Sequence, residues 1–372
     1  MQSGNDSSSY NRLFDLYNNN LHKGVRQVFK STSTNKKELE YLYKFEANTT
    51  KFSAYKAKRV NDALISLHKE SPEGFNAKAK GVLKTFNRFQ AVECNTVVAR
   101  SRTARQFMRF NETKELYQHL EWVRTRSANP RELHLSFVGL IKSIDDPFFK
   151  TNSPGELYGC KCSLRATDKP VTEREVKNVT PSKGLEGNPY FTREIFSEEH
   201  PYFKGGKDPE TEAFITEQIF KQFNEMKTAG GSYFIHPLQD VNASDLKDLE
   251  LIAKAFVEKE KIDVYVMPKM TASKGDLYNY LFKNRGAFEN KCPDLLIGDF
   301  FYEYESSKIW GEHVLRNMIS NGAKQADRII IDVRKSDDAL WYIKKRIINR
   351  VENTGLKEVW MFTETGLEQV VI

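Results

Sequence analysis

Apolar residues recur at intervals of three and four along the first hundred residues, as at Leu13, Leu16 and Tyr17 and again at Val60, Ala63, Leu64 and Leu67. This spacing places side chains on one face of an α-helix, so it predicts helical structure from Asn11 to about Met108. The sequence Ser-Pro-Glu-Gly at residues 71–74 is the one clear turn inside that stretch. Residues 1–10 are polar and low in complexity, and we expect them to be disordered.

The middle of the chain changes pattern several times. The helical spacing continues through Trp122 and stops at Asn129-Pro130, because the residue before a proline disfavours the helical conformation. Residues 134–162 are predicted to form strand and loop. Residues 166–207 contain several Pro and Gly pairs without a sustained period, which indicates a linker or an extended arm laid on a neighbour. Asp208-Pro209 then opens a helix whose apolar stripe consists of Phe214, Ile215, Ile219, Phe220 and Phe223.

The C-terminal part mixes helical and strand patterns. Ser244-Asp245 is suited to cap a helix, and the two-residue turn Gly298-Asp299 between apolar runs predicts a β-hairpin of residues 295–297 and 300–305. We also expect strands at 263–267, 328–333, 359–362 and 369–372 and helices at 310–322 and 339–350. The predicted class is α+β. Its parts are a disordered segment 1–10, a mainly helical domain 11–170 with a small strand and loop block, a linker or arm with a helix at 171–240, and a compact α+β domain 241–372 with a mostly antiparallel sheet.

Composition narrows the class of protein. The chain has 372 residues, of which 39% are hydrophobic, enough for two or three globular domains. No apolar stretch approaches the roughly 20 residues that cross a bilayer, so we expect no membrane partner. The first residues, MQSGNDSSSYN, lack the basic and apolar regions of a secretory signal. Four cysteines favour a reducing compartment over a disulfide framework.

Charge is unevenly distributed along the chain. Residues 1–170 hold 29 basic against 17 acidic residues, and the remainder holds 28 against 33. The positive front half suits contact with DNA or with an acidic protein surface, and a solvated helical face is the plainer alternative. The C-terminal half has no strongly basic nucleic-acid footprint.

The stretch His134–Cys162 begins with a histidine, passes through an Asp-Asp-Pro turn and closes on Cys160 and Cys162. One imidazole and two thiols are ligands that zinc prefers, which makes His134, Cys160 and Cys162 a candidate zinc site. In the alternative, the histidine forms hydrogen bonds in a loop and the cysteines are small buried residues. A disulfide between the two cysteines would be strained by its short loop. A closed zinc site needs a fourth ligand, for which the candidates are Asp145, Asp146 and Cys94.

This stretch resembles the Mu F-type minor head domain of tailed bacteriophages. Members have a His, a short apolar segment with Gly, an acidic-Pro-aromatic turn and a terminal Cys-x-Cys in that order. The likeness extends over about residues 80–170, where Val97–Thr103 matches an Ala-Arg-Thr-type helix and Trp122 matches a tryptophan before the His. The resemblance implies a minor capsid protein of head morphogenesis, inside the virion near the portal. Portal and capsid proteins would be its partners, and packaged DNA would face the basic half.

Three acidic residues come together in the predicted hairpin. A two-residue turn at Gly298-Asp299 places Asp294 directly opposite Glu303, with the side chains about 5 Å apart, and alternation puts Glu305 on the same face. Because like charges repel, such a cluster needs a bound cation, a basic neighbour or a shared proton with a raised pKa. A solvated edge hairpin is the alternative. The candidate basic neighbours are Lys308, Arg316, Lys324 and Arg334.

The same region resembles the C-terminal tRNA-nuclease domains of contact-dependent inhibition toxins, within the wider group of barnase, EndoU, colicin and RelE-like ribonucleases. The shared pattern over about residues 245–372 is Pro-Asp, apolar residues, Gly, Glu-x-Lys, a helix and Gln-Ala-Asp. Glu305 stands where relatives have Lys, and Lys308 is the nearest substitute. The resemblance implies a metal-independent nuclease for tRNA or other RNA, with an immunity protein as a partner. The candidate catalytic residues are Asp294, Glu303, Glu305, Lys308, His313, Arg316, Asn317 and Gln325.

Several alternatives stay open. The polar face of the helix at 310–322 either contacts RNA phosphates or is simply solvated, and His313 is either a general acid or a bystander. Asp followed by Glu-x-Lys is also similar to restriction-type nucleases, in which two carboxylates hold magnesium. The whole chain is expected in the virion or the bacterial cytoplasm. We expect a minor head protein with an appended nuclease domain. The alternatives are a purely structural head protein with an inactive tail and a toxin that uses the head domain as a delivery adaptor.

Overall fold

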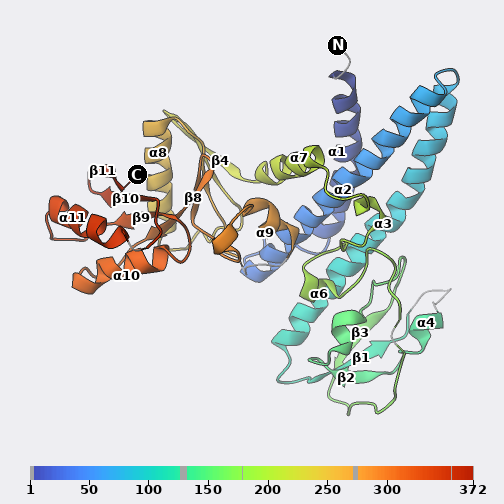
Figure 1. The fold of residues 1–372 in the computed structure, drawn as a ribbon. Coiled ribbons are helices and arrows are strands. Elements are labelled where there is room, and N and C mark those ends of the chain that lie inside the picture. Colours follow the sequence, from blue (N-terminus) through green and yellow to red (C-terminus); the bar gives the residue numbers. More distant parts are fainter. Residues whose placement is uncertain (1–3, 126–131, 178, 271–274, 353, 372) are drawn as a thin grey trace. The chain divides into compact units, whose positions relative to one another are not determined.

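The computed structural model describes residues 4–125, 132–177, 179–270, 275–352 and 354–371 (Figure 1). The chain divides into two compact units: residues 1–218 with 274–280, and residues 219–273 with 281–372. Helices and sheets occur together, which confirms the predicted α+β class. None of the helices in the described ranges is long and apolar enough to cross a membrane.

Three long helices form the body of the first unit: α1 (Gly4–Arg26), α2 (Lys36–Glu70) and α3 (Phe75–Glu112). They pack side by side (Figure 1), and the predicted turn at residues 71–74 separates α2 from α3. A further break precedes α2, where the side chain of Asn35 caps the helix by accepting two backbone N–H groups. Helix α1 begins at Gly4, so the prediction of disorder is wrong for residues 4–10. The ring of Tyr10 packs on Phe214 with centroids 5.1 Å apart, which holds this end of α1.

A small antiparallel sheet follows α3. Its order is β2 (Ile141–Ser143), β1 (His119–Val123) and β3 (Ser163–Thr167), with the short helices α4 (Glu132–Leu135) and α5 (Phe148–Thr151) beside it. The predicted continuation of helix through Trp122 is therefore wrong. Leu120 and Trp122 alternate with more exposed neighbours and pair with β3, so their burial follows a strand period. His134, predicted in a strand-like run, lies in α4.

Residues 168–207 have little regular structure, yet they pack on the helices of the same unit through α6 (Pro189–Thr192) and the short 3₁₀ helix η1 (Pro201–Phe203). Phe196 stacks on Phe52 of α2 with ring centroids 3.9 Å apart. Arg100 of α3 is fully buried and donates to the carbonyl oxygens of Leu185 and Gly187, so this basic residue is structural.

Two more helices complete the first unit. Helix α7 (Pro209–Phe220) starts on its proline as predicted, and α9 (Asp276–Leu281) was not predicted. Lys51 of α2 forms a buried ion pair with Asp276, with Nζ and Oδ1 3.0 Å apart. Part of the positive charge of residues 1–170 is thus directed inward, because Lys44, Lys51, Lys56 and Arg100 are all buried.

The second unit is built on an eight-stranded mixed sheet whose order is β11-β10-β9-β8-β7-β6-β5-β4. The hairpin β7–β8 lies near its centre, and β9 runs parallel to β8. The predicted strands and hairpin in this part are confirmed, whereas β4 and β5 were not predicted. The strands are β4 (Asn224–Thr228), β5 (Gly231–Ile235), β6 (Val264–Val266), β7 (Leu295–Ile297), β8 (Phe300–Glu305), β9 (Arg328–Asp332), β10 (Glu358–Thr363) and β11 (Gly366–Val371).

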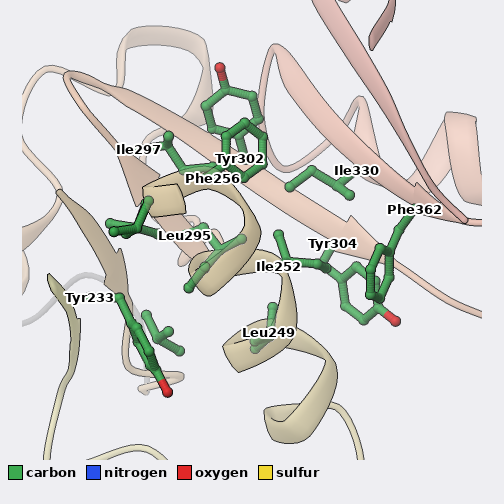
Figure 2. Packing of buried hydrophobic residues seen from close by; sticks show 14 of the residues in the cluster. Tyr233, Leu249, Ile252, Phe256, Leu295, Ile297, Tyr302, Tyr304, Ile330 and Phe362 are labelled. Carbon is green, nitrogen blue, oxygen red and sulfur yellow. The ribbon is translucent and has the colours of Figure 1, made fainter. Parts of the chain in front are cut away.

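Helices cover both faces of this sheet. Helix α8 (Leu246–Glu260) packs on one face, where Phe256 and Ile252 meet Tyr302 and Ile330 (Figure 2). Helices α10 (Glu312–Gly322) and α11 (Leu340–Val351) pack on the other face, in a second apolar cluster. Neighbouring residues of β9 belong to different clusters, as side chains of a strand alternate between faces. A short 3₁₀ turn, η2 (Gly286–Phe288), precedes β7.

Candidate functional site

The hairpin has the register that the sequence predicts. Leu295 pairs with Tyr302 and Ile297 with Phe300, so Asp294 falls opposite Glu303 at the open end. The backbone N–H of Tyr304 donates to Oδ2 of Asp294 at 3.0 Å, which fixes that carboxylate beside β8. The local turn chemistry therefore suffices to bring the acids of both strands together.

The three acids share the sheet face opposite α8. Leu295, Tyr302 and Tyr304 point into the α8 cluster, so the alternate residues Asp294, Glu303 and Glu305 point the other way. On that side α10 ends at Gly322, where an added Cβ would lie 3.3 Å from Cγ of Glu305 and 2.7 Å from a methyl group of Ile329. A glycine at this position lets the end of α10 approach the Glu305 side chain closely.

Burial gives the acid group unusual proton affinities. Asp294 is only 1% exposed, and Glu303 and Glu305 are half-buried. Burial and the neighbouring charges of Asp294 and Glu305 raise the pKa of Glu303 to about 9. Burial and the charge of Asp294 raise the pKa of Glu305 to about 7. Among the described residues, none donates a hydrogen bond to the buried Oε2 of Glu303. The group thus brings together three acids whose pKa values are raised, and it holds an unpartnered oxygen.

A lysine that the sequence reasoning missed meets this group. Lys269 follows β6, and its Nζ lies 3.1 Å from Oδ1 of Asp294 and 2.8 Å from Oδ2 of Asp245 at the start of α8. Because β6 runs antiparallel to β7, the residues just after β6 lie near those just before β7. The antiparallel pairing of β6 with β7 was the signal that could have found Lys269, because Pro268 ends the β6 strand just before this lysine. Asp245 was expected only as a helix cap, yet its side chain accepts from Lys269 and makes no capping hydrogen bond.

The other predicted residues lie around the group rather than in it. Lys308, His313, Arg316 and Asn317 are exposed, so the polar face predicted for α10 faces solvent. Gln325 contributes its backbone oxygen, which accepts from Arg285 at 2.5 Å. Arg334, a predicted basic neighbour, is instead bound to Asp332 and Asp248. The lysine that contacts the acid group is Lys269, through Asp294.

A second group of side chains lies in the first unit. His134 Nδ1 is 3.4 Å from the sulfur of both Cys160 and Cys162, and its Nε2 is 3.1 Å from Oε1 of the buried Glu156. Hydrogen bonds from Cys162 and His134 lower the pKa of Cys160 to about 4. Burial opposes the charged form of His134, but hydrogen bonds to Cys160 and Glu156 raise its pKa to about 9. The three residues thus form a group that could hold a metal ion, as the sequence predicts.

The predicted fourth ligands do not join this group. Among the described residues, the metal-type donors within 4.8 Å of one another are those of His134, Cys160 and Cys162 alone. Asp145 pairs with Lys114, and Asp146 binds Lys142 and a backbone N–H. All four cysteines are free thiols. Cys160 and Cys162 line a cavity of about 520 Å³ that also borders Arg102, Gln106 and Lys161.

Comparison with protein-family models, with curated proteins and with solved structures finds no match to this chain.

Proposed function

We propose that the second unit is a nuclease whose reaction centre is formed by Asp294, Glu303, Glu305 and Lys269. The observation that carries this proposal is the grouping of three carboxylates on one sheet face, with Oε2 of Glu303 buried and unpartnered. Such an arrangement costs free energy through burial and repulsion, so a functional ligand that offsets the charge is the simplest account. The sequence resemblance to toxin nucleases supports RNA, with tRNA as a candidate, as the substrate.

The donor set suits a divalent cation. Carboxylate oxygens are the ligands that magnesium prefers, and Asp294 and Glu303 offer oxygens on facing strands. A bound magnesium ion would polarise a phosphodiester and lower the pKa of a water molecule. Glu305, with a pKa of about 7, is suited to accept a proton from the attacking water molecule near neutral pH. Lys269 would offset the negative charge that develops on the phosphate.

This geometry favours a metal-dependent reaction over the metal-independent one that the sequence resemblance implied. A metal-independent cleavage by the 2′-hydroxyl needs a general acid beside the base, and His313 is the sequence candidate. His313 is exposed on α10 and has no hydrogen bond to the acids in the described part of the chain. The unpartnered carboxylate oxygen, by contrast, is what a cation would use.

The test is cleavage of labelled tRNA and of single-stranded DNA by the full-length chain, with magnesium or with EDTA. We expect magnesium-dependent cleavage of RNA that Glu303→Gln lowers by about 100-fold or more. Glu364→Gln, in the exposed turn between β10 and β11, is the matched control and should retain activity. Cleavage that survives Glu303→Gln would overturn the assignment, and activity in EDTA would overturn the metal.

We also propose that the first unit binds zinc through His134, Cys160 and Cys162. Zinc–sulfur and zinc–nitrogen bonds of about 2.3 and 2.0 Å at a tetrahedral angle place S and N about 3.5 Å apart. The two observed distances of 3.4 Å, from His134 Nδ1 to the sulfur atoms of Cys160 and Cys162, match that separation. Glu156 supports the site from behind, because a carboxylate on the remote ring nitrogen is the usual way to orient a metal-binding histidine. A water molecule from the adjoining cavity would supply the fourth position.

Metal analysis of the full-length chain purified without chelators tests this assignment. We expect about one zinc per chain, lost in His134→Ala and retained in the control His119→Ala, whose ring lies on β1 and binds a backbone oxygen. Well under one zinc in the wild-type chain would contradict it.

The role in a phage head rests on the sequence resemblance of the first unit, and its supporting observation is that the spaced His and Cys-x-Cys form one side-chain group. In that role the unit would place the nuclease near the portal, with portal and capsid proteins as partners. Co-purification of the chain with phage heads would test it, and a chain found only free in the cell, beside an inhibitory immunity protein, would favour the toxin alternative.

A further inference from the structure

Helix α11 begins with three large apolar residues that the fold leaves in solvent. Trp341 is 70% exposed, and Leu340 and Tyr342 are 42% and 43% exposed. Ile343 and Ile347 of the same helix are fully buried against the sheet, so the helix is anchored by its other face. The rings of Trp341 and Tyr342 lie edge to face with their centroids 5.8 Å apart. A tryptophan held on a helix in this way offers a broad, ordered ring to a partner.

This end of α11 lies at the sheet edge that carries the acid group. Strands β8 and β9 are parallel, with Glu305 opposite Ile331, so their carboxyl ends share one edge. The loops that follow the two strands are joined by a hydrogen bond of 3.2 Å from Trp310 Nε1 to Oδ2 of Asp338. Asp338 comes just before α11, and Ile309, 77% exposed, comes just before Trp310. The exposed apolar side chains therefore come from segments that meet beside the end of β8.

The exposed charges of these segments are mainly positive. Lys308 follows β8, Lys335 follows β9 and Lys345 lies on α11, all exposed, and Asp337 is an exposed carboxylate among them. Helix α11 itself contains basic residues and no acidic residue. Its other cations are partly used within the fold, since Lys344 pairs with Glu368 at 2.5 Å. Positive side chains near exposed rings suit a nucleic-acid strand, because cations bind its phosphates and flat rings stack on its bases.

We propose that the start of α11 and the two adjoining loops form a docking surface for a single-stranded nucleic acid. One base stacks on Trp341, and the backbone phosphates lie along Lys308, Lys335 and Lys345. A strand docked there passes the carboxyl end of β8, where Glu305 lies. The inference rests on the proposed nuclease function and adds to it the side from which the substrate enters.

The experiment measures binding separately from cleavage. The full-length chain with Glu303→Gln is titrated into fluorescein-labelled oligouridine or oligothymidine of about 12 nucleotides, and anisotropy gives Kd. Trp341→Ala in that background should weaken binding by about 5- to 150-fold, the loss of one stacked base, and Trp341→Phe should restore most of it. Lys345→Ala should lower the slope of log Kd against log salt concentration by about 0.7. Leu251→Ala and Lys247→Ala, exposed on α8 at the opposite sheet face, are the matched controls and should change neither quantity.

The outcomes separate this inference from the nuclease itself. Binding that depends on Trp341 supports the surface even if the wild-type chain cleaves nothing. Cleavage and binding that are equal in Trp341→Ala and wild type overturn the surface while leaving the nuclease. Loss of self-association in Trp341→Ala, with oligonucleotide binding unchanged, would make this patch a contact between copies of the chain and overturn the inference.

Discussion

Replacement of Glu303 by glutamine removes one ionisable group from the acid group and keeps the shape of the side chain. Burial and the charges of Asp294 and Glu305 raise the pKa of Glu303 from 4.5 to about 9. Below pH 4.5 the carboxyl group is protonated in both the folded and the unfolded chain, so its ionisation does not change the free energy of unfolding. Above that pH the unfolded chain releases the proton and the folded chain retains it up to about pH 9. The free energy of unfolding of the wild-type chain therefore falls as the pH rises through this window.

The size of the effect follows from the width of the window. Each pH unit above 4.5 costs about 1.4 kcal/mol, so at pH 7 the wild-type chain has lost at most about 3 kcal/mol. Glutamine carries no such cost. We expect Glu303→Gln, free of divalent cations, to be more stable than wild type by up to about 3 kcal/mol at pH 7. For a unit of this size that corresponds to a rise in melting temperature of about 6–12 °C. The variant would gain stability as it loses activity.

Urea unfolding of the full-length chain in EDTA measures this difference in stability. The fraction unfolded is read from a hydrogen-exchange pulse, applied at one fixed pH, at the backbone amides of β8 and β9. Those strands report on the second unit alone. Glu364→Gln, which removes an exposed carboxylate, should match wild type at every pH. Equal stability of Glu303→Gln and wild type at pH 7 would refute the reasoning, and so would an advantage that persists unchanged below pH 4.5.

Three further outcomes follow from the contacts. Lys269→Met should lower kcat by about 100-fold. It should also move the acidic limb of the pH–rate profile to higher pH, because Lys269 lowers the pKa of the proton acceptor Glu305. Lys254→Met, exposed on α8, should alter neither quantity. Burial lowers the pKa of His200 to about 4, so below pH 6.5 the unfolded chain takes up a proton that the folded chain does not. The free energy of unfolding of the first unit should therefore fall by about 2 kcal/mol by pH 5. Urea unfolding of His200→Gln should show no such fall. Gly184→Ala should lower the free energy of unfolding by about 3 kcal/mol, because the added Cβ would lie 2.3 Å from the His200 ring and residue 184 has a φ of +89°. An unchanged urea midpoint would contradict this packing.

Local patterns predicted much of the second unit. The Gly298-Asp299 turn fixed the hairpin register, because a two-residue loop allows one pairing and alternation then assigns each side chain to a face. The same alternation assigns Asp294, Glu303 and Glu305 to one face from the sequence alone. Helices α8, α10 and α11 were predicted, and the sheet buries one apolar face of each.

Non-local pairing decided what those patterns did not contain. The sequence of β1 continues the helical spacing of the preceding residues. It forms a strand because β2 and β3, distant in the chain, supply its hydrogen-bond partners. Non-local contact also decides the surroundings of His134, because Glu156 rather than an acid of the Asp-Asp turn contacts its ring.

The division is sharpest at the acid group. The sequence by itself determined the three acids and the face that they share, because all of these lie within one hairpin. Only the tertiary structure supplied Lys269, which is 25 residues from Asp294 along the chain and reaches it because β6 pairs antiparallel with β7. It likewise joined the loop before α11 to the segment that follows β8, through the hydrogen bond from Trp310 to Asp338. Short-range spacing specifies a hairpin, whereas the charges and surfaces around it depend on which strands become neighbours.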